Sequence, residues 1–231
     1  MNFLFVLLIA LPIVVGVSYT YLHAFNKQYA KPISLFTAAL LLCITVINFL
    51  PEVFEHVPNK SYAGVAILLG LVVQLGLERF SNGLEHGHVH HAGQIKFYIS
   101  YIALLLHSFA EGTPLLISIN GNSLLVGLIV HNIPVTIILM QLINTLNKPL
   151  WQRLVIISAL GLSTLAGALM AQYLANYTQL LFNTHYVLAF VCGLFLHIGT
   201  SLLYEFNRGK EQLLLKLILV IAALGICLLL K

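Results

Sequence analysis

The stretch Ser123–Ile143, SLLVGLIVHNIPVTIILMQLI, decides the class of fold. It contains no charged side chain, and as an α-helix it would span about 30 Å, the thickness of the hydrocarbon core of a bilayer. This length and composition predict a transmembrane helix. Near its middle the run carries two polar residues, His131 and Asn132.

The rest of the chain has the same apolar character. Of its 231 residues 60% are hydrophobic and 8% are charged, and the mean hydropathy is +0.97. Polar breaks separate eight apolar runs, at 2–25, 31–51, 61–77, 97–119, 123–143, 152–174, 185–205 and 211–230. We therefore expect an all-α polytopic membrane protein with about eight transmembrane helices and a single transmembrane domain over 1–231.

The basic residues indicate an orientation in the membrane. The chain has 11 Lys and Arg against 7 acidic residues, a net charge of +4, and nine of the basic residues lie in or beside the connections that follow odd-numbered runs. Basic connections stay in the cytoplasm, so we expect both termini outside it. The excess charge needs no nucleic acid partner to explain it, and the short connections favour a bacterial inner membrane.

The longest connection, 78–96, is expected in the cytoplasm and contains the tract HGHVHH. His-rich tracts can bind divalent metals weakly. A solvated polar loop without that role explains the same composition, and both interpretations stay open.

The stretch His107–Pro114, HSFAEGTP, places two chemically active side chains in an apolar run. His107 and Glu111 are four residues apart, so a helix presents them on one face. Glu111 is the only carboxylate deep in a run, where an uncompensated charge is costly and marks a functional site. Counted from a turn near Gly121, Glu111 and His131 both lie about 15 Å below the surface and His107 about 21 Å, so the three should converge.

Two imidazoles and one carboxylate are ligands of the kind that zinc prefers, and three protein ligands leave a position open for exchange. Pro114 and Pro134 should free the carbonyls of Ala110 and Val130, and irregular backbone at membrane depth normally lines a cavity. The alternative is an apolar bundle in which a neutral Glu111 bonds to His107 and the prolines only pack.

A further histidine, His197 in GLFLHIGTS, admits two interpretations: a fourth ligand on the pathway, or a buried hydrogen-bonded side chain.

Four fragments carry a resemblance to the ZIP (Zrt/Irt-like) family of divalent metal transporters. HSFAEG resembles the family's H-N-x-x-D/E-G motif, and HNIP, His131–Pro134, resembles the start of its H-E-I-P-H-E motif. FLPEVFE, Phe49–Glu55, and GLFLHIGTSLLYE, Gly193–Glu205, are similar to the ends of the family's second and seventh helices. The order of the apolar runs, the outside termini and the His-rich connection also agree.

The chain departs from the family at the residues that would hold a second metal ion. Ser108 stands where the family has asparagine, and Asn132, Val135 and Thr136 replace the two glutamates and the second histidine of H-E-I-P-H-E. We therefore expect one metal ion at a time.

The resemblance implies a 3+2+3 arrangement of helices with inverted repeats. It also implies transport of a divalent transition metal into the cytoplasm, with zinc as first choice and Fe²⁺, Mn²⁺ or Co²⁺ open. The metal would be cargo rather than a tightly bound cofactor, and no enzyme activity is expected. The candidate metal residues are His107, Glu111, His131, Asn132, Ser108 and His197.

Two alternatives remain. One is a ZIP-derived membrane protein that binds or senses metal without transporting it, and the other is an intramembrane zinc hydrolase. The hydrolase lacks a spare carboxylate to act as base once Glu111 ligates the metal. The expected partners are the metal ion and the lipid bilayer, and a homodimer is left open.

Overall fold

Every regular element in the described part of the chain is a helix. The computed structural model describes residues 10–15, 17–18, 27–81, 94–144, 146, 148–177, 184–205 and 210–230. The elements are α2 (Lys27–Ile44), the π-helical turn η1 (Thr45–Phe49), α3 (Leu50–His56), α4 (Lys60–Ser81), α5 (Gln94–Gly112), the 3-10 turn η3 (Thr113–Leu116), α6 (Gly121–Asn144), α7 (Leu150–Tyr177), α8 (Thr184–Glu205) and α9 (Lys210–Leu229). Most of the expected first helix, 2–25, and most of the connection 78–96 lie outside these residues.

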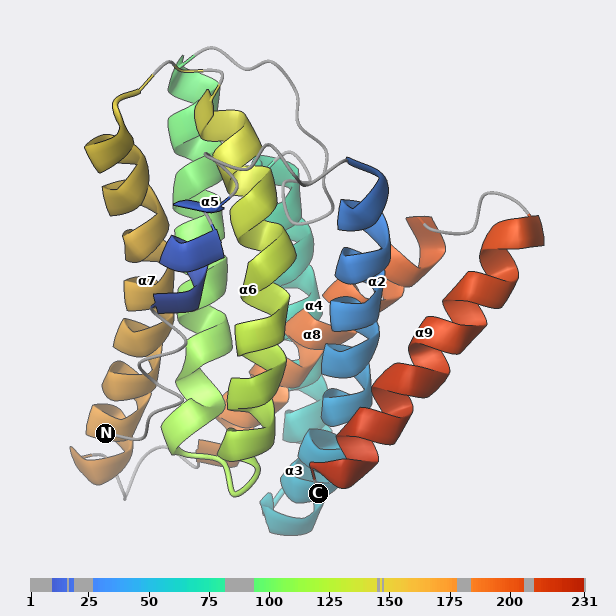
Figure 1. Cartoon of the computed structure of the whole chain (residues 1–231). Coiled ribbons are helices and arrows are strands. Elements are labelled where there is room, and N and C mark those ends of the chain that lie inside the picture. Colours follow the sequence, from blue (N-terminus) through green and yellow to red (C-terminus); the bar gives the residue numbers. More distant parts are fainter. Residues whose placement is uncertain are drawn as a thin grey trace.

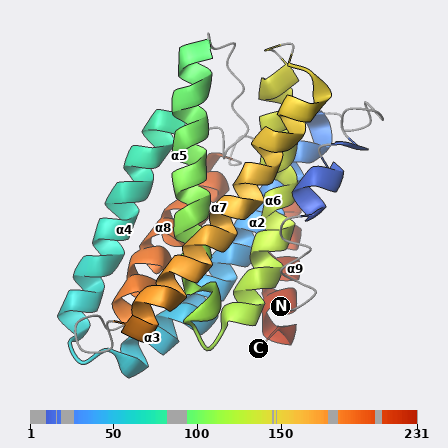
Figure 2. The ribbon, with the colours of Figure 1, turned by 90° about the vertical axis from the view of Figure 1, so that its left-hand side faces the viewer.

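Six helical segments among the described residues are long and apolar enough to cross a membrane, and Leu213–Leu229 forms a shorter apolar helix. The expected all-α class is confirmed. The helices run up and down: the starts of α2, α5, α7 and α9 lie at the same end of the molecule as the ends of α4, α6 and α8 (Figure 1 and Figure 2). This alternation gathers Arg79, Lys96, Lys148 and Arg153 at one end and leaves Lys60 at the other.

α2 continues into α3 through an extra residue in the turn η1. The N–H of Leu50 donates to the carbonyl of Thr45, five residues back, as in a π-helix. Pro51 follows directly, and its ring would crowd the carbonyl four residues earlier in a regular α-helix. A π-type turn is one of the local adjustments that accommodates such a residue.

The helix over 97–119 expected from the sequence is shorter in the structure, because α5 ends at Gly112 and Pro114 lies in η3. The carbonyl of Ala110, expected to be free, accepts a hydrogen bond from the Thr113 hydroxyl at 2.8 Å. The expectation of an open carbonyl there was wrong, because the residue before the proline supplies the missing donor. Pro134 lies inside α6, which continues past it to Asn144.

Two pairs of helices touch backbone to backbone at glycines. A Cβ atom on Gly70 or Gly193 would lie 1.9 Å from a carbonyl oxygen of the opposite helix, which joins α4 to α8. A Cβ atom on Gly112 or Gly167 would meet the same obstacle at 1.9 Å, which joins α5 to α7. Small residues permit this close approach between membrane helices, where packing rather than water exclusion drives association.

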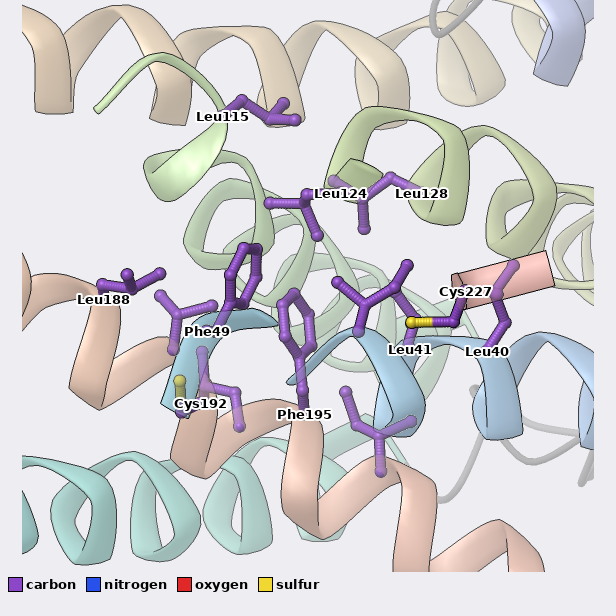
Figure 3. Packing of buried hydrophobic residues seen from close by; sticks show 14 of the residues in the cluster. Leu40, Leu41, Phe49, Leu115, Leu124, Leu128, Leu188, Cys192, Phe195 and Cys227 are labelled. Atoms are coloured by element: carbon purple, nitrogen blue, oxygen red, sulfur yellow. The ribbon is translucent and has the colours of Figure 1, made fainter. Parts of the chain in front are cut away.

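α6 lies at the centre of the apolar packing and belongs to two clusters. The first cluster draws mainly on α2, α6 and α8, with further residues from η1, α3, α4, η3, α7 and α9. It includes the stacked rings of Phe49 and Phe195, 6.5 Å apart between centroids (Figure 3). The second joins α5, α6 and α7. α6 leaves the first cluster after Leu128 and enters the second at Val135, so His131 lies between them.

Candidate metal centre

Three buried side chains from two helices meet in the interior of the helical segments. His107 and Glu111 lie one turn apart on α5, and His131 lies on α6 between the two apolar clusters. Nε2 of His107 is 3.1 Å from Oε1 of Glu111, and Nε2 of His131 is 3.7 Å from the same oxygen. Each of the three residues is at most 2% exposed.

The local sequence explains why these side chains converge. The spacing of four on α5 puts His107 and Glu111 on one face. Gly112, next to Glu111, brings α5 against α7 without an intervening side chain. Among the described residues, these three form the only group of three or more His, Cys, Asp or Glu side chains able to share a metal ion.

The spacing of the donor atoms fits a small divalent cation. One donor atom from each residue lies within 4.8 Å of the other two. Zinc with bonds of about 2.1 Å holds tetrahedral ligand atoms about 3.4 Å apart. The contacts of 3.1 and 3.7 Å to Glu111 lie on either side of this value, so small side-chain rotations would complete three bonds and leave further positions for water or exchange.

The close approach of Glu111 and His107 favours a positive charge between them. Oε1 of Glu111 has no hydrogen-bond partner among the described residues, although Nε2 of His107 is only 3.1 Å away. A bare imidazole nitrogen and a carboxylate oxygen at this distance would face each other with lone pairs. A proton or a metal ion between them removes this repulsion in an interior where an unpaired charge is costly.

A fourth residue, Gln74 on α4, contacts the ring nitrogen of His107 that does not face Glu111. Nδ1 of His107 is 3.0 Å from Oε1 of Gln74, and both side chains are buried. Histidines that bind a metal through one nitrogen commonly hold a hydrogen bond through the other, which fixes the ring. Gln74 was not among the residues predicted for the site, although it is the only polar side chain in the run 61–77 after Ser61 and Tyr62.

Two of the other sequence candidates, Ser108 and Asn132, directly follow His107 and His131 in the sequence and are buried, at 2% exposure each. Nδ2 of Asn132 has no hydrogen-bond partner within the described ranges, and neither has Oγ1 of the buried Thr136. Polar atoms therefore occur on α6 near His131, but these side chains supply no negative charge of the kind that a carboxylate would bring to a second metal position.

His197 is not a member of the three-residue group. Its Nε2 contacts Oε2 of Glu78 on α4, and this partly buried pair lies across the α4–α8 contact. The sequence placed Glu78 at the start of the connection 78–96; in the structure α4 continues to Ser81, and Glu78 lies in its last turn. The structure therefore shows His197 as a hydrogen-bonded side chain.

Comparison of the chain with models of known protein families and with curated proteins finds no match. Function is therefore inferred from the residues and their geometry.

Proposed function

We propose that the protein carries a divalent transition metal ion, zinc first, across a membrane, and that His107, Glu111 and His131 bind the ion in transit. The observation that carries this proposal is the convergence of three buried donors from two helices within 4.8 Å. Ionisable side chains inside membrane helices commonly mark ion pathways. The resemblance of HSFAEG and HNIP to ZIP motifs supports the same class of transporter.

The composition of the site suits an ion that must be released. One carboxylate and two neutral imidazoles leave a divalent ion with a net positive charge, which weakens binding in an apolar interior. The same ligands accept Fe²⁺, Mn²⁺ or Co²⁺ as well as zinc. Protons compete for all three ligands, so the affinity for metal falls as the pH falls.

The distribution of basic residues supports an orientation of the protein in the membrane. The end of the molecule with Arg79, Lys96, Lys148 and Arg153 would face the cytoplasm of a bacterial inner membrane. The ion would enter from the end that carries Lys60 and leave toward the His-rich connection. Run 2–25 and α9 would complete eight helices in a 3+2+3 arrangement, with both termini outside.

A protein that binds or senses metal without transporting it is the second candidate. Asn132 and Thr136, both buried, stand where the ZIP motif has carboxylates. Without those carboxylates the chain would bind one ion at a time. It could not use a transport cycle that needs two bound ions.

Zinc influx into proteoliposomes tests both candidates. The wild type is compared with His107→Ala and Glu111→Gln, with a pH-sensitive dye in the same vesicles. The control is His56→Ala, which removes an exposed histidine at the end of α3. Saturable influx that is lost in both site variants and kept in the control supports transport. Zinc binding without influx favours the second candidate, and zinc-dependent lipid hydrolysis would favour a hydrolase.

A further inference from the structure

Gln74 occupies a position on α4 that packing alone does not explain. α4 exposes most of its surface: Val73 and Leu75 are 42% and 54% exposed, while Gln74 between them is 0% exposed. The other buried residues of α4 are small: Ala63, Gly70 and Ser81. The one long side chain on this narrow buried side is thus an amide, and its Oε1 lies 3.0 Å from Nδ1 of His107.

A glutamine amide can satisfy either neutral form of the imidazole. Its end carries an acceptor oxygen and a donor nitrogen, and half a turn of the amide exchanges their positions. In one orientation the oxygen accepts from a protonated Nδ1 of His107. In the other orientation the amide N–H donates to a bare Nδ1.

The two forms of His107 have opposite effects on the site. With the proton on Nδ1, the lone pair of Nε2 is available to a metal ion beside Glu111. With the proton on Nε2, the ring can donate across the 3.1 Å to Oε1 of Glu111 and close the site without a metal. The imidazole is neutral and carries one proton in both forms. Each change of tautomer therefore releases a proton from one ring nitrogen and takes one up at the other.

We propose that Gln74 is a positioning residue that supports both tautomers of His107, so that the ring alternates between a metal ligand and a hydrogen-bond donor to Glu111. This inference rests on the proposed function of the site. A carboxylate at position 74 would only accept, and would hold His107 in the metal-binding tautomer. A metal-binding histidine commonly donates its second N–H to a carboxylate, a backbone carbonyl or water, which fixes one tautomer, whereas the amide of Gln74 can support either one.

The experiment compares Gln74→Glu, which keeps the shape of the side chain, and Gln74→Leu with the wild type. Gln172→Glu is the matched control, because Gln172 is exposed on α7. Three quantities are measured: the tautomer of His107 by ¹⁵N NMR on the metal-free protein, the affinity for zinc in detergent, and the KM and kcat of zinc flux. A His107→Asn variant identifies the NMR signal.

Gln74→Glu is expected to hold His107 with the proton on Nδ1, where the wild type also populates the Nε2 form. It should bind zinc about 10-fold more tightly and lower kcat, while Gln74→Leu should bind zinc about 10- to 100-fold more weakly. An unchanged tautomer and affinity in Gln74→Glu, or equal changes in Gln172→Glu, overturn the proposal. If the wild type binds no zinc, the proposed function fails, and the tautomer measured without metal still decides whether Gln74 sets the ring.

Discussion

Oε2 of Glu52 accepts a hydrogen bond from Nδ2 of Asn120 at 2.8 Å and so links the first turn of α3 to the turn that precedes α6. The same carboxylate accepts from the Ser118 hydroxyl at 2.9 Å and from the backbone N–H of Ile119 at 3.0 Å. Glu52 is only 5% exposed. One buried carboxylate therefore holds the connection between η3 and α6, at the end of the molecule that carries Lys60.

Glu52→Ala should destabilise the protein, because it removes the acceptor of all three hydrogen bonds. Hydrogen bonds to charged groups contribute about 1.5–3 kcal/mol each, so the loss should reach about 3 kcal/mol or more. Thermal unfolding in detergent measures it. Glu55→Ala is the control, since Glu55 is exposed on the same short helix. Equal melting temperatures for the two variants would contradict the role of Glu52.

Zinc should stabilise the wild type and leave Glu111→Gln unaffected. A ligand that binds only the folded state at 100 times its dissociation constant adds about 2.7 kcal/mol to the free energy of unfolding. The glutamine keeps the size of the side chain but removes the only charged ligand. Melting curves over a series of zinc concentrations measure the effect. A zinc-dependent rise in both proteins would place the binding site elsewhere.

Gly112→Ala should force α5 away from α7, since the new Cβ would lie 1.9 Å from a backbone oxygen. We expect a loss of thermal stability and a weaker affinity for zinc, because Glu111 is the adjacent residue. Gly64→Ala is the matched control: a Cβ there meets nothing within 4 Å. In that control alanine should be neutral or stabilising by up to about 1 kcal/mol, from helix propensity alone.

His197→Ala should lower thermal stability while leaving the affinity for zinc close to that of the wild type. The substitution breaks the contact with Glu78 that joins α4 and α8. His197 is not one of the three residues that could share a metal ion. In a double-mutant cycle with Glu78→Gln, the second substitution should add little to the first. A loss of zinc affinity in His197→Ala comparable to that in His131→Ala would instead make it a ligand.

Deletion of residues 85–91 should retain zinc transport and change its apparent affinity only modestly. This His-rich tract lies outside the described residues, and the three proposed ligands do not include it. Uptake measured against zinc concentration checks this expectation. Complete loss of uptake in the folded deletion variant would show that the tract is part of the pathway.

The helices were predictable because a membrane helix needs about 20 consecutive apolar residues, and such runs can be found directly in the sequence. The runs from 31 to 230 each correspond to a helix in the structure, with shifted ends. The largest shift, at the end of α5, follows from Pro114 and the Thr113 hydroxyl. The π-type turn before Pro51 was not predicted, since apolar composition does not reveal an extra residue in a turn.

The candidate site was predictable in part. A histidine and a carboxylate four residues apart share a helix face, and equal depths on consecutive helices predicted that His131 would meet Glu111. The partners supplied by distant helices were not predictable. Gln74, Glu78 and Glu52 each act on a residue far along the chain, and their sequence neighbours do not show which helix lies opposite.

The glycine contacts join the helices around the site into two closely packed bodies, α4 with α8 and α5 with α7. At Gly70 and Gly193 the backbones of α4 and α8 meet with no side chain between them, and the backbones of α5 and α7 meet in the same way at Gly112 and Gly167. Gln74 belongs to the first body, and His107 and Glu111 belong to the second. The hydrogen bond between Gln74 and His107 therefore joins the two bodies. A slide of one helix pair past the other would change the distance between Gln74 and His107, so displacement of the pairs and the orientation of the His107 ring are coupled at this contact.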